Sequence, residues 1–207
     1  MSSRDAGQVD AVVFDVGRVL YRWDLRHIFA PVIADAEALD RFVGEVVTAE
    51  WHFQCDAGRE LDAMIAERCR TFPQHAELIA RYRENFLDSI PGPVAGSLEL
   101  VEALHARGVP LYAITNFGAE FWQRFRATAP VFDRFGDVVV SGVEKLAKPD
   151  PAIFALAAAR FGHAPGRMLF VDDVEANVRA AEASGWQVHH FHDAAGLEAD
   201  LRARKVL

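Results

Sequence analysis

Five short runs of apolar residues constrain the fold of this chain more than any other feature of its sequence. They are rich in Val, Ile and Phe and lie at residues 11–15, 111–115, 137–141, 168–172 and 187–191. Runs of this length, bounded by turn-forming residues, predict β-strands. From the second run onward they alternate with helix-like segments, two of which end in Gly, as helices often do. This rhythm predicts an α/β fold with a doubly wound parallel sheet.

The stretch after the first strand breaks that rhythm. Residues 22–90 contain helix-like patterns but nothing that alternates as a strand does, and a strand-to-helix connection is usually far shorter. Four segments in this stretch have helical patterns, at 24–35, 36–54, 59–71 and 75–90. The tripeptide Pro91-Gly92-Pro93 then returns the chain to the sheet. We therefore predict a core of residues 1–21 and 91–207, with a small helical cap, residues 22–90, inserted into it.

Composition narrows the partners and the location. The 207 residues, 51% of them hydrophobic, suffice for one α/β domain with a modest insertion. The net charge of −8, with Lys and Arg scattered among acidic residues, argues against a nucleic-acid partner. The sequence starts without the apolar core of a signal peptide, has no apolar run long enough for a membrane span, and its two cysteines suggest no disulfide framework. We expect a cytoplasmic monomer or homodimer without membrane or nucleic-acid partners.

Polar side chains stand where three of the predicted strands end. These residues are Asp15, Thr115 and Asp172, with Asp173 immediately after the last. Ligands of open α/β sheets bind beyond the carboxyl ends of the strands, so these side chains should converge on one crevice. Any one Asp alone is better explained as a turn or helix-capping residue. Their joint placement is what predicts an active site.

Four segments of the chain together resemble the signature of the haloacid-dehalogenase-like (HAD) superfamily. VVFDVGRVL at 12–20 is similar to its first motif, LYAITN at 111–116 to its second, KPDPAIF at 148–154 to its third and FVDDVEANV at 170–178 to its fourth. A lone first motif is weak evidence, whereas four ordered motifs on strand ends are specific. The resemblance implies a Rossmann-like core and a Mg²⁺-dependent phosphatase that forms an aspartyl-phosphate intermediate.

The resemblance also implies roles in phosphoryl transfer. Asp15 would be the nucleophile, and Lys148 would pair with both Asp15 and the phosphoryl oxygens. Lys145 is a rival for the lysine role, but Lys148 stands directly before a proline, as the family's lysine does. Hydrogen bonds to the transferring group would come from the Thr115 hydroxyl and from backbone N–H groups near Val16, Gly17 and Asn116.

A magnesium site is implied by the same motifs. A hard cation prefers oxygen ligands, so Asp15, the Gly17 carbonyl and Asp173 would hold Mg²⁺. Asp172 would act on the ion directly or through water. Asn177, four residues after Asp173, would orient Lys148 or the surroundings of the ion.

Gly17 departs from the pattern of most phosphatases in the superfamily. These carry a second Asp at this position, which protonates the leaving group and then activates water. A subset that resembles α-glucose-1-phosphate phosphatases shares the FDxGxV form, and this sequence is most similar to that subset. The nearest possible substitutes are Asp24 and His27, although capping or packing of the first cap helix explains both more simply.

A run in the cap, residues 50–60, concentrates polar and aromatic side chains around a turn that contains Gly. Its members include Trp51, His52, Gln54, Asp56 and Arg59. Selection of a leaving group needs such side chains, and we predict that Trp51 and His52 contact the substrate. An ordinary amphipathic helix with Trp51 in the cap core explains the run equally well.

Three functions fit these observations. The leading one is a phosphatase acting on a small phosphorylated metabolite, such as a sugar phosphate or nucleotide. A 2-haloacid dehalogenase would use the same nucleophile without a metal, but the pair Asp172-Asp173 favours a cation site. A catalytically silent binding protein is the third, and Gly17 is the feature that supports it.

Overall fold

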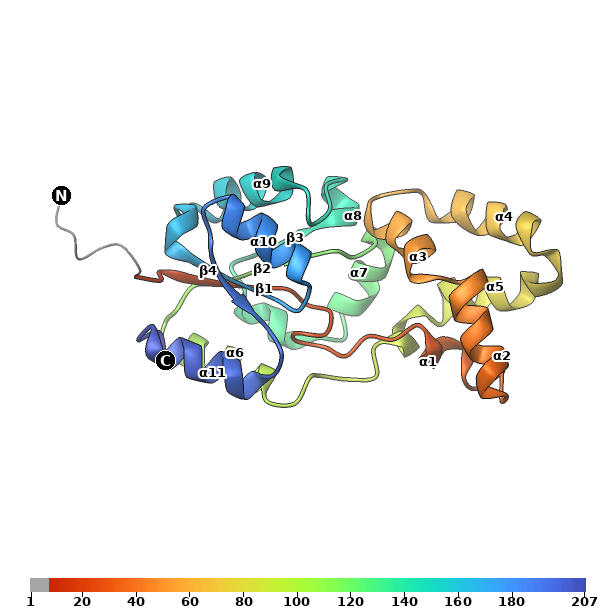
Figure 1. Ribbon diagram of the computed structural model, residues 1–207, viewed down its shortest axis with the longest axis horizontal. Coiled ribbons are helices and arrows are strands. Elements are labelled where there is room, and N and C mark those ends of the chain that lie inside the picture. The colour runs from red at the N-terminus through yellow and green to blue at the C-terminus, as the bar shows by residue number, and fades with distance from the viewer. Residues whose placement is uncertain (1–7) are drawn as a thin grey trace.

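The five predicted strands form one parallel sheet in the computed structural model, which describes residues 8–207 (Figure 1). The strands are β1 (Ala11–Phe14), β2 (Leu111–Thr115), β3 (Asp137–Val140), β4 (Met168–Asp172) and β5 (Gln187–His190). Their order across the sheet is β3-β2-β1-β4-β5. The predicted α/β fold with a doubly wound parallel sheet is thereby confirmed. Residues 1–7 lie outside the described residues. The part of the predicted core that they form, and the prediction that no signal peptide starts the sequence, therefore fall outside the structure.

Helices cover both faces of the sheet (Figure 1). They are α6 (Ser97–Ala106), α7 (Ala119–Arg126), α8 (Ser141–Glu144), α9 (Pro151–Phe161), α10 (Glu175–Ala183) and α11 (Ala194–Ala203). Successive side chains of β1 point to opposite faces, as the period of a strand requires. Val12 therefore packs in the cluster that contains residues of α6, α7 and α11, whereas Val13 packs in the cluster that contains residues of α9 and α10.

The parallel register brings the carboxyl ends of the central strands to one edge. Phe14 at the end of β1 pairs with Ala113 of β2 and Val171 of β4. The next backbone step is also fixed, because the Asp15 N–H donates to the Val171 carbonyl at 2.8 Å. The residues that follow β1, β2 and β4 therefore emerge side by side at this edge.

Residues 22–90, which we call the cap, contain helices and turns but no strand. Its α-helices are α1 (Arg26–Phe29), α2 (Ala36–Arg41), α3 (Ala49–Asp56), α4 (Leu61–Thr71) and α5 (Ala76–Glu84). Shorter helical turns complete the chain, a π-helical turn at Phe42–Val46 and 3₁₀ turns at Pro73–His75, Phe86–Ser89, Pro130–Arg134 and Pro165–Arg167. Among the described residues, none of these helices is both long and apolar enough to cross a membrane.

Two of the predicted cap helices are shorter than expected. The segment 24–35 forms only α1, and Pro31 follows the helix closely, where proline cannot continue a helical hydrogen-bond ladder. The segment 36–54 is interrupted between the π-helical turn and α3, where Thr48 has extended backbone angles. The Thr48 side chain accepts a hydrogen bond from the Trp51 N–H and so begins α3 as its N-cap.

The cap packs against the core at the edge where the strands end. Phe86 stacks on Phe121 of α7 with ring centroids 3.8 Å apart. Arg83 forms a two-pronged ion pair with Glu120, with nitrogen–oxygen distances of 2.9 and 2.7 Å. The Ser141 hydroxyl donates to the carbonyl of Asp56 at the end of α3, at 2.5 Å. These contacts position the cap over the strand ends.

Candidate active site

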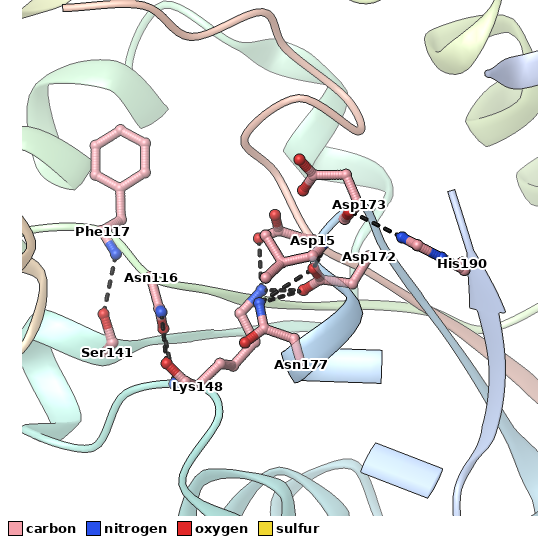
Figure 2. Close-up of polar contacts among 10 residues, drawn as sticks. Asp15, Asn116, Phe117, Ser141, Lys148, Asp172, Asp173, Asn177 and His190 are labelled. Carbon is pink, nitrogen blue, oxygen red and sulfur yellow. Dashed lines mark hydrogen bonds and ion pairs between the residues drawn. The ribbon is translucent and has the colours of Figure 1, made fainter. Parts of the chain in front are cut away.

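Three carboxylates meet at the strand ends. Asp15 follows β1, Asp172 ends β4, and Asp173 follows it; one oxygen from each lies within 4.8 Å of the others (Figure 2). Asp15 is 8% exposed and Asp172 is fully buried, while Asp173 is more accessible. Buried like charges at this spacing repel one another, so the arrangement requires positive charge.

Lys148 supplies part of that charge. Its Nζ lies 2.7 Å from Asp15 Oδ1 and 2.6 Å from Asp172 Oδ2, and the residue is 2% exposed (Figure 2). Lys145, the rival considered from the sequence, is exposed instead. The Asn116 amide fixes the Lys148 backbone, because Oδ1 accepts from the Lys148 N–H and Nδ2 donates to the Lys148 carbonyl, both at 2.9 Å. Asn116 thus positions the lysine.

Asp172 is held from several sides. Asn177 Nδ2 lies 3.1 Å from both of its carboxylate oxygens, and the Val174 N–H donates to Oδ1 at 2.8 Å. With Lys148 on Oδ2, both oxygens have protein partners. Asn177 therefore orients Asp172, and through it the lysine. The Asp173 side chain remains directed at the cavity side of the cluster, while its carbonyl contacts His190 Nε2 at 3.0 Å (Figure 2).

Burial and mutual repulsion control the charge of this cluster. The pKa of Asp15 is raised to about 7, chiefly by burial; the Lys148 ammonium lowers it, and the charges of Asp172 and Asp173 raise it. Burial and the neighbouring Asp172 also raise the pKa of Asp173. For Lys148, burial lowers the pKa, but the attraction of Asp15 and Asp172 outweighs it and the pKa rises. The lysine therefore stays charged, yet three carboxylates face one ammonium.

The donor set fits a divalent cation. Asp15 and Asp173 offer carboxylate oxygens at the cavity, which are the ligands that Mg²⁺ prefers, and Asp172 lies within reach beside them. The excess negative charge and the raised pKa of Asp15 both give a cation a favourable place. A bound Mg²⁺ would neutralise carboxylate and phosphate charge and so let the two approach.

A cavity of about 330 Å³ opens above the cluster. Core residues form its floor and cap residues form much of its wall. The lining residues are Asp15, Gly17, Arg18, Trp23, Ala49, His52, Phe53, Asp56, Phe86, Asn116, Phe117, Lys148, Asp173, Val174 and Asn177. The floor is polar, whereas four aromatic side chains line the walls. A phosphate group therefore suits the floor and an apolar group suits the space above it.

The cavity contains some of the residues predicted from the sequence and excludes others. Asp15, Gly17, His52, Asn116, Lys148 and Asp173 line it. Asp172, Val16 and Thr115 are buried beneath the floor and do not line it. The expected substrate contact by Trp51 finds no support, because Trp51 is 5% exposed, outside the cavity, and packs edge-on against Tyr82 at 4.8 Å.

The two substitutes considered for the missing acid also lie outside the cavity. Asp24 Oδ1 accepts from the N–H of Arg26, the first residue of α1, at 2.9 Å. His27 is exposed on the same helix. The structural explanation therefore holds for Asp24, whereas the exposed His27 side chain neither lines the cavity nor packs in the cap core.

Sequence reasoning missed most of the apolar wall. Phe53 stood inside the run at 50–60, and Phe117 directly follows the second motif, so position alone could have indicated these two. Trp23 and Phe86 carry no local signal, because only the packing of the cap brings them to the cavity. Arg18 has a positive φ of 60°, and its guanidinium lies 5.3 Å from the centre of the Trp23 ring. Arg18 therefore places a positively charged side chain at the rim of the cavity.

Residues 9–185 match the haloacid dehalogenase-like hydrolase family. Because this match covers most of the chain, the protein belongs to that family of hydrolases. A sesquiterpene phosphatase, astK of Aspergillus oryzae, is 26% identical over 200 residues, which cover 93% of this chain and 94% of that protein. Phosphoglycolate phosphatase of Escherichia coli is 35% identical over 83 residues, which cover 40% of this chain and 33% of the enzyme.

Solved structures share the fold over nearly the whole chain. A predicted HAD-like hydrolase from Porphyromonas gingivalis has a TM-score of 0.72 at 20% identity and covers 95% of this chain and 98% of its own. The HAD family enzyme bt-2542 from Bacteroides thetaiotaomicron, in complex with magnesium and inorganic phosphate, has a TM-score of 0.67 at 18% identity, with coverages of 89% and 95%. L-2-haloacid dehalogenase from Xanthobacter autotrophicus reaches 0.62 at 16% identity, with coverages of 97% and 85%. The fold therefore accommodates more than one reaction.

Proposed function

We propose that this protein is a Mg²⁺-dependent phosphatase that hydrolyses a small phosphorylated metabolite through an aspartyl-phosphate on Asp15. The observation that carries the proposal is the bridge of Lys148 between Asp15 and Asp172, beside Asp173 at the bottom of a cavity. Phosphoryl transfer needs an in-line nucleophile and neutralised charge more than it needs covalent machinery. This floor combines a nucleophilic carboxylate, a fixed ammonium and oxygen ligands for a cation.

In the proposed reaction, an oxygen of Asp15 attacks phosphorus while the bond from phosphorus to the leaving oxygen breaks. Lys148 neutralises the charge that spreads over the phosphoryl oxygens. Water then attacks the phosphorus of the aspartyl-phosphate, which releases orthophosphate and restores the Asp15 carboxylate. Asn116 and Asn177 keep the lysine and Asp172 in place throughout.

We further propose that the leaving group is predominantly apolar. Above the floor, the cavity presents the aromatic faces of Trp23, Phe53, Phe86 and Phe117. Phe53 of the cap and Val174 of the core, which are 41% and 42% exposed, also line this cavity and add to its apolar surface. A sugar, with hydroxyls on every side, would leave many hydrogen bonds unmade here. The full-length similarity to a sesquiterpene phosphatase supports the apolar class over the sugar phosphates considered from the sequence.

The test is a screen of phosphate esters with and without Mg²⁺, pairing sugar phosphates with aryl and isoprenyl phosphates. We expect Mg²⁺-dependent release of orthophosphate, fastest from apolar esters. Preferred hydrolysis of sugar phosphates would overturn the apolar assignment alone. Metal-independent release of halide from 2-haloacids, or no hydrolysis of any ester, would overturn the phosphatase and favour the dehalogenase or the silent binding protein.

A further inference from the structure

Asp56 lines the cavity and has one buried carboxylate oxygen without a partner. The residue ends α3, lines the cavity and is 5% exposed. Oδ2 lies 3.2 Å from His52 Nε2, whereas Oδ1 is buried without a hydrogen-bond partner among residues 8–207. A buried carboxylate oxygen without a partner is costly, so a purely structural role for Asp56 would be expected to use both oxygens.

A buried chain of hydrogen bonds fixes the protons around Asp56. The Tyr82 hydroxyl lies 2.7 Å from His52 Nδ1. Burial, with the nearby Cys55 and Asp56, raises the pKa of Tyr82 well above its ordinary value, so the phenol stays neutral and its hydroxyl can donate a hydrogen bond to Nδ1. Nε2 then carries the imidazole proton and donates to Asp56 Oδ2. Both nitrogens of His52 are thereby engaged, and Oδ1 of Asp56 is the free end of the chain.

Packing holds this group rigidly. The His52 ring lies between Trp23 and Phe86, stacked on both, with centroid distances of 5.0 and 5.4 Å. The Ser141 hydroxyl ties the Asp56 carbonyl to the core. Orientation of this kind is what an acid–base group requires, because proton transfer depends on placement before it depends on strength.

Elimination points to the same residue. The carboxylates that line the cavity are Asp15, Asp173 and Asp56. Asp15 and Asp173 belong to the floor, where they face Lys148 and each other. Gly17 has no side chain to offer. Asp56 is the carboxylate on the wall, where the leaving group must lie.

We propose that Asp56 is the acid–base catalyst of this site, contributed by the cap and oriented by His52, in the place of the group that Gly17 lacks. The inference rests on the proposed phosphatase. As the bond between phosphorus and the leaving oxygen breaks, the Asp56 carboxyl group transfers a proton to that oxygen and the alcohol departs. The Asp56 carboxylate then takes a proton from the water that attacks the aspartyl-phosphate, which restores both carboxyl groups.

The test compares two esters of similar shape, phenyl phosphate and p-nitrophenyl phosphate, because the nitro group lets the second leaving group depart without a proton. We expect Asp56→Asn to lower kcat/KM for phenyl phosphate by about 10²–10⁴-fold and for p-nitrophenyl phosphate by less than about tenfold. Asp88→Asn, an exposed aspartate of the cap outside the cavity, is the matched control and should change neither. If Asp56 has only a structural role, Asp56→Asn lowers kcat/KM for both esters in parallel, and that result overturns the proposal.

The wild-type protein provides a second measurement that does not depend on a variant folding. With a working acid, kcat/KM for the two esters should agree within about tenfold, whereas a preference for the nitro ester above about 10²-fold would show that no proton is donated. Failure of this inference is separable from failure of the phosphatase itself. If the nitro ester is hydrolysed with Mg²⁺ but the two esters respond equally to Asp56→Asn, only the role of Asp56 is wrong.

Discussion

The floor and the wall of the cavity are built on different principles. On the floor, charged groups from the ends of the strands pair with one another, and Lys148 contacts two carboxylates at hydrogen-bond distance. On the wall, cap residues and Phe117 of the core surround the space with aromatic faces, and one oxygen of Asp56 is unpaired. Under the proposed function, the floor holds one group, a phosphoryl ester with its cation, whereas the wall selects and protonates what is attached to it.

The most damaging change to the floor is Asp15→Asn. We expect turnover of every ester to fall by at least about 10⁴-fold, because the amide cannot form the aspartyl-phosphate. The fold should survive, since the side chains have the same shape. Steady-state kinetics and circular dichroism check the two halves of this prediction. Substantial hydrolysis by a folded Asp15→Asn protein would mean that the floor does not supply the nucleophile.

Lys148→Met should damage the floor next. Two buried carboxylates would lose their counter-charge, so we expect turnover to fall by about 10²–10³-fold. The free energy of unfolding should drop by about 3–5 kcal/mol, as measured by urea denaturation. The exposed Lys145→Met is the control, with changes of less than about twofold in activity. Equal effects of the two substitutions would leave the lysine role unassigned.

The division between floor and wall can be probed by moving the acid from one to the other. A Cβ at Gly17 would meet no atom within 4 Å, and its φ is not positive, so an aspartate fits there. In the Asp56→Asn background, Gly17→Asp should raise kcat/KM for phenyl phosphate by about tenfold to 10²-fold. Gly17→Ser in the same background adds a side chain without a carboxyl group, and so tests whether the acid, rather than bulk, restores activity. If kcat/KM of the double variant for phenyl phosphate does not exceed that of Asp56→Asn alone, an acid at position 17 cannot replace Asp56.

Asp173→Ala should weaken Mg²⁺ binding without changing the ester preference. The site would lose an anionic oxygen ligand, and we expect the dissociation constant for Mg²⁺ to rise by about 10–100-fold. Isothermal calorimetry with Mg²⁺ measures this directly. The ester preference should stay the same at saturating Mg²⁺, because Asp173 lies on the floor. An unchanged affinity would identify a different ligand.

The smallest expected effect belongs to the wall. Phe53→Ser removes an apolar face and should raise KM for phenyl phosphate by about five- to tenfold with little change in kcat. Arg59→Ala is the matched control from the same cap: Arg59 is exposed, pairs with Gln54 and Glu67, and does not line the cavity. Parallel responses of the two variants would show that the cap acts only as support.

The floor was largely predictable from the sequence, and the wall was not. β1, β2 and β4 are largely buried apolar runs, and in a parallel sheet their ends must share an edge, so the sequence pattern alone grouped Asp15 with Asp172 and Asp173. Lys148 was added by the resemblance to the HAD superfamily. The positioning function of the Asn116 side chain was not predictable, since it depends on a contact with the backbone 32 residues away.

The wall depends on how the cap folds, and local patterns describe that poorly. Trp23 and Phe86 meet around His52 only because the short helices of the cap bring them there. The breaks after α1 and before α3 were missed because apolar spacing continues across them, while Pro31 and Thr48 determine the backbone. Whether a given aromatic residue lies in the cap core, as Trp51 does, or in the cavity, as Phe53 does, is likewise a property of packing.

Capture of a phosphorylated Asp15 is the most direct test of the proposed mechanism. Protein mixed with Mg²⁺ and a radiolabelled phosphate ester is quenched in acid, reduced with borohydride to convert an acyl phosphate into an alcohol, and mapped by peptide mass spectrometry. We predict label on the protein before reduction and a reduced side chain at Asp15, absent without Mg²⁺. Turnover of the ester with no modification of Asp15, or with the modification on another residue, would contradict the mechanism.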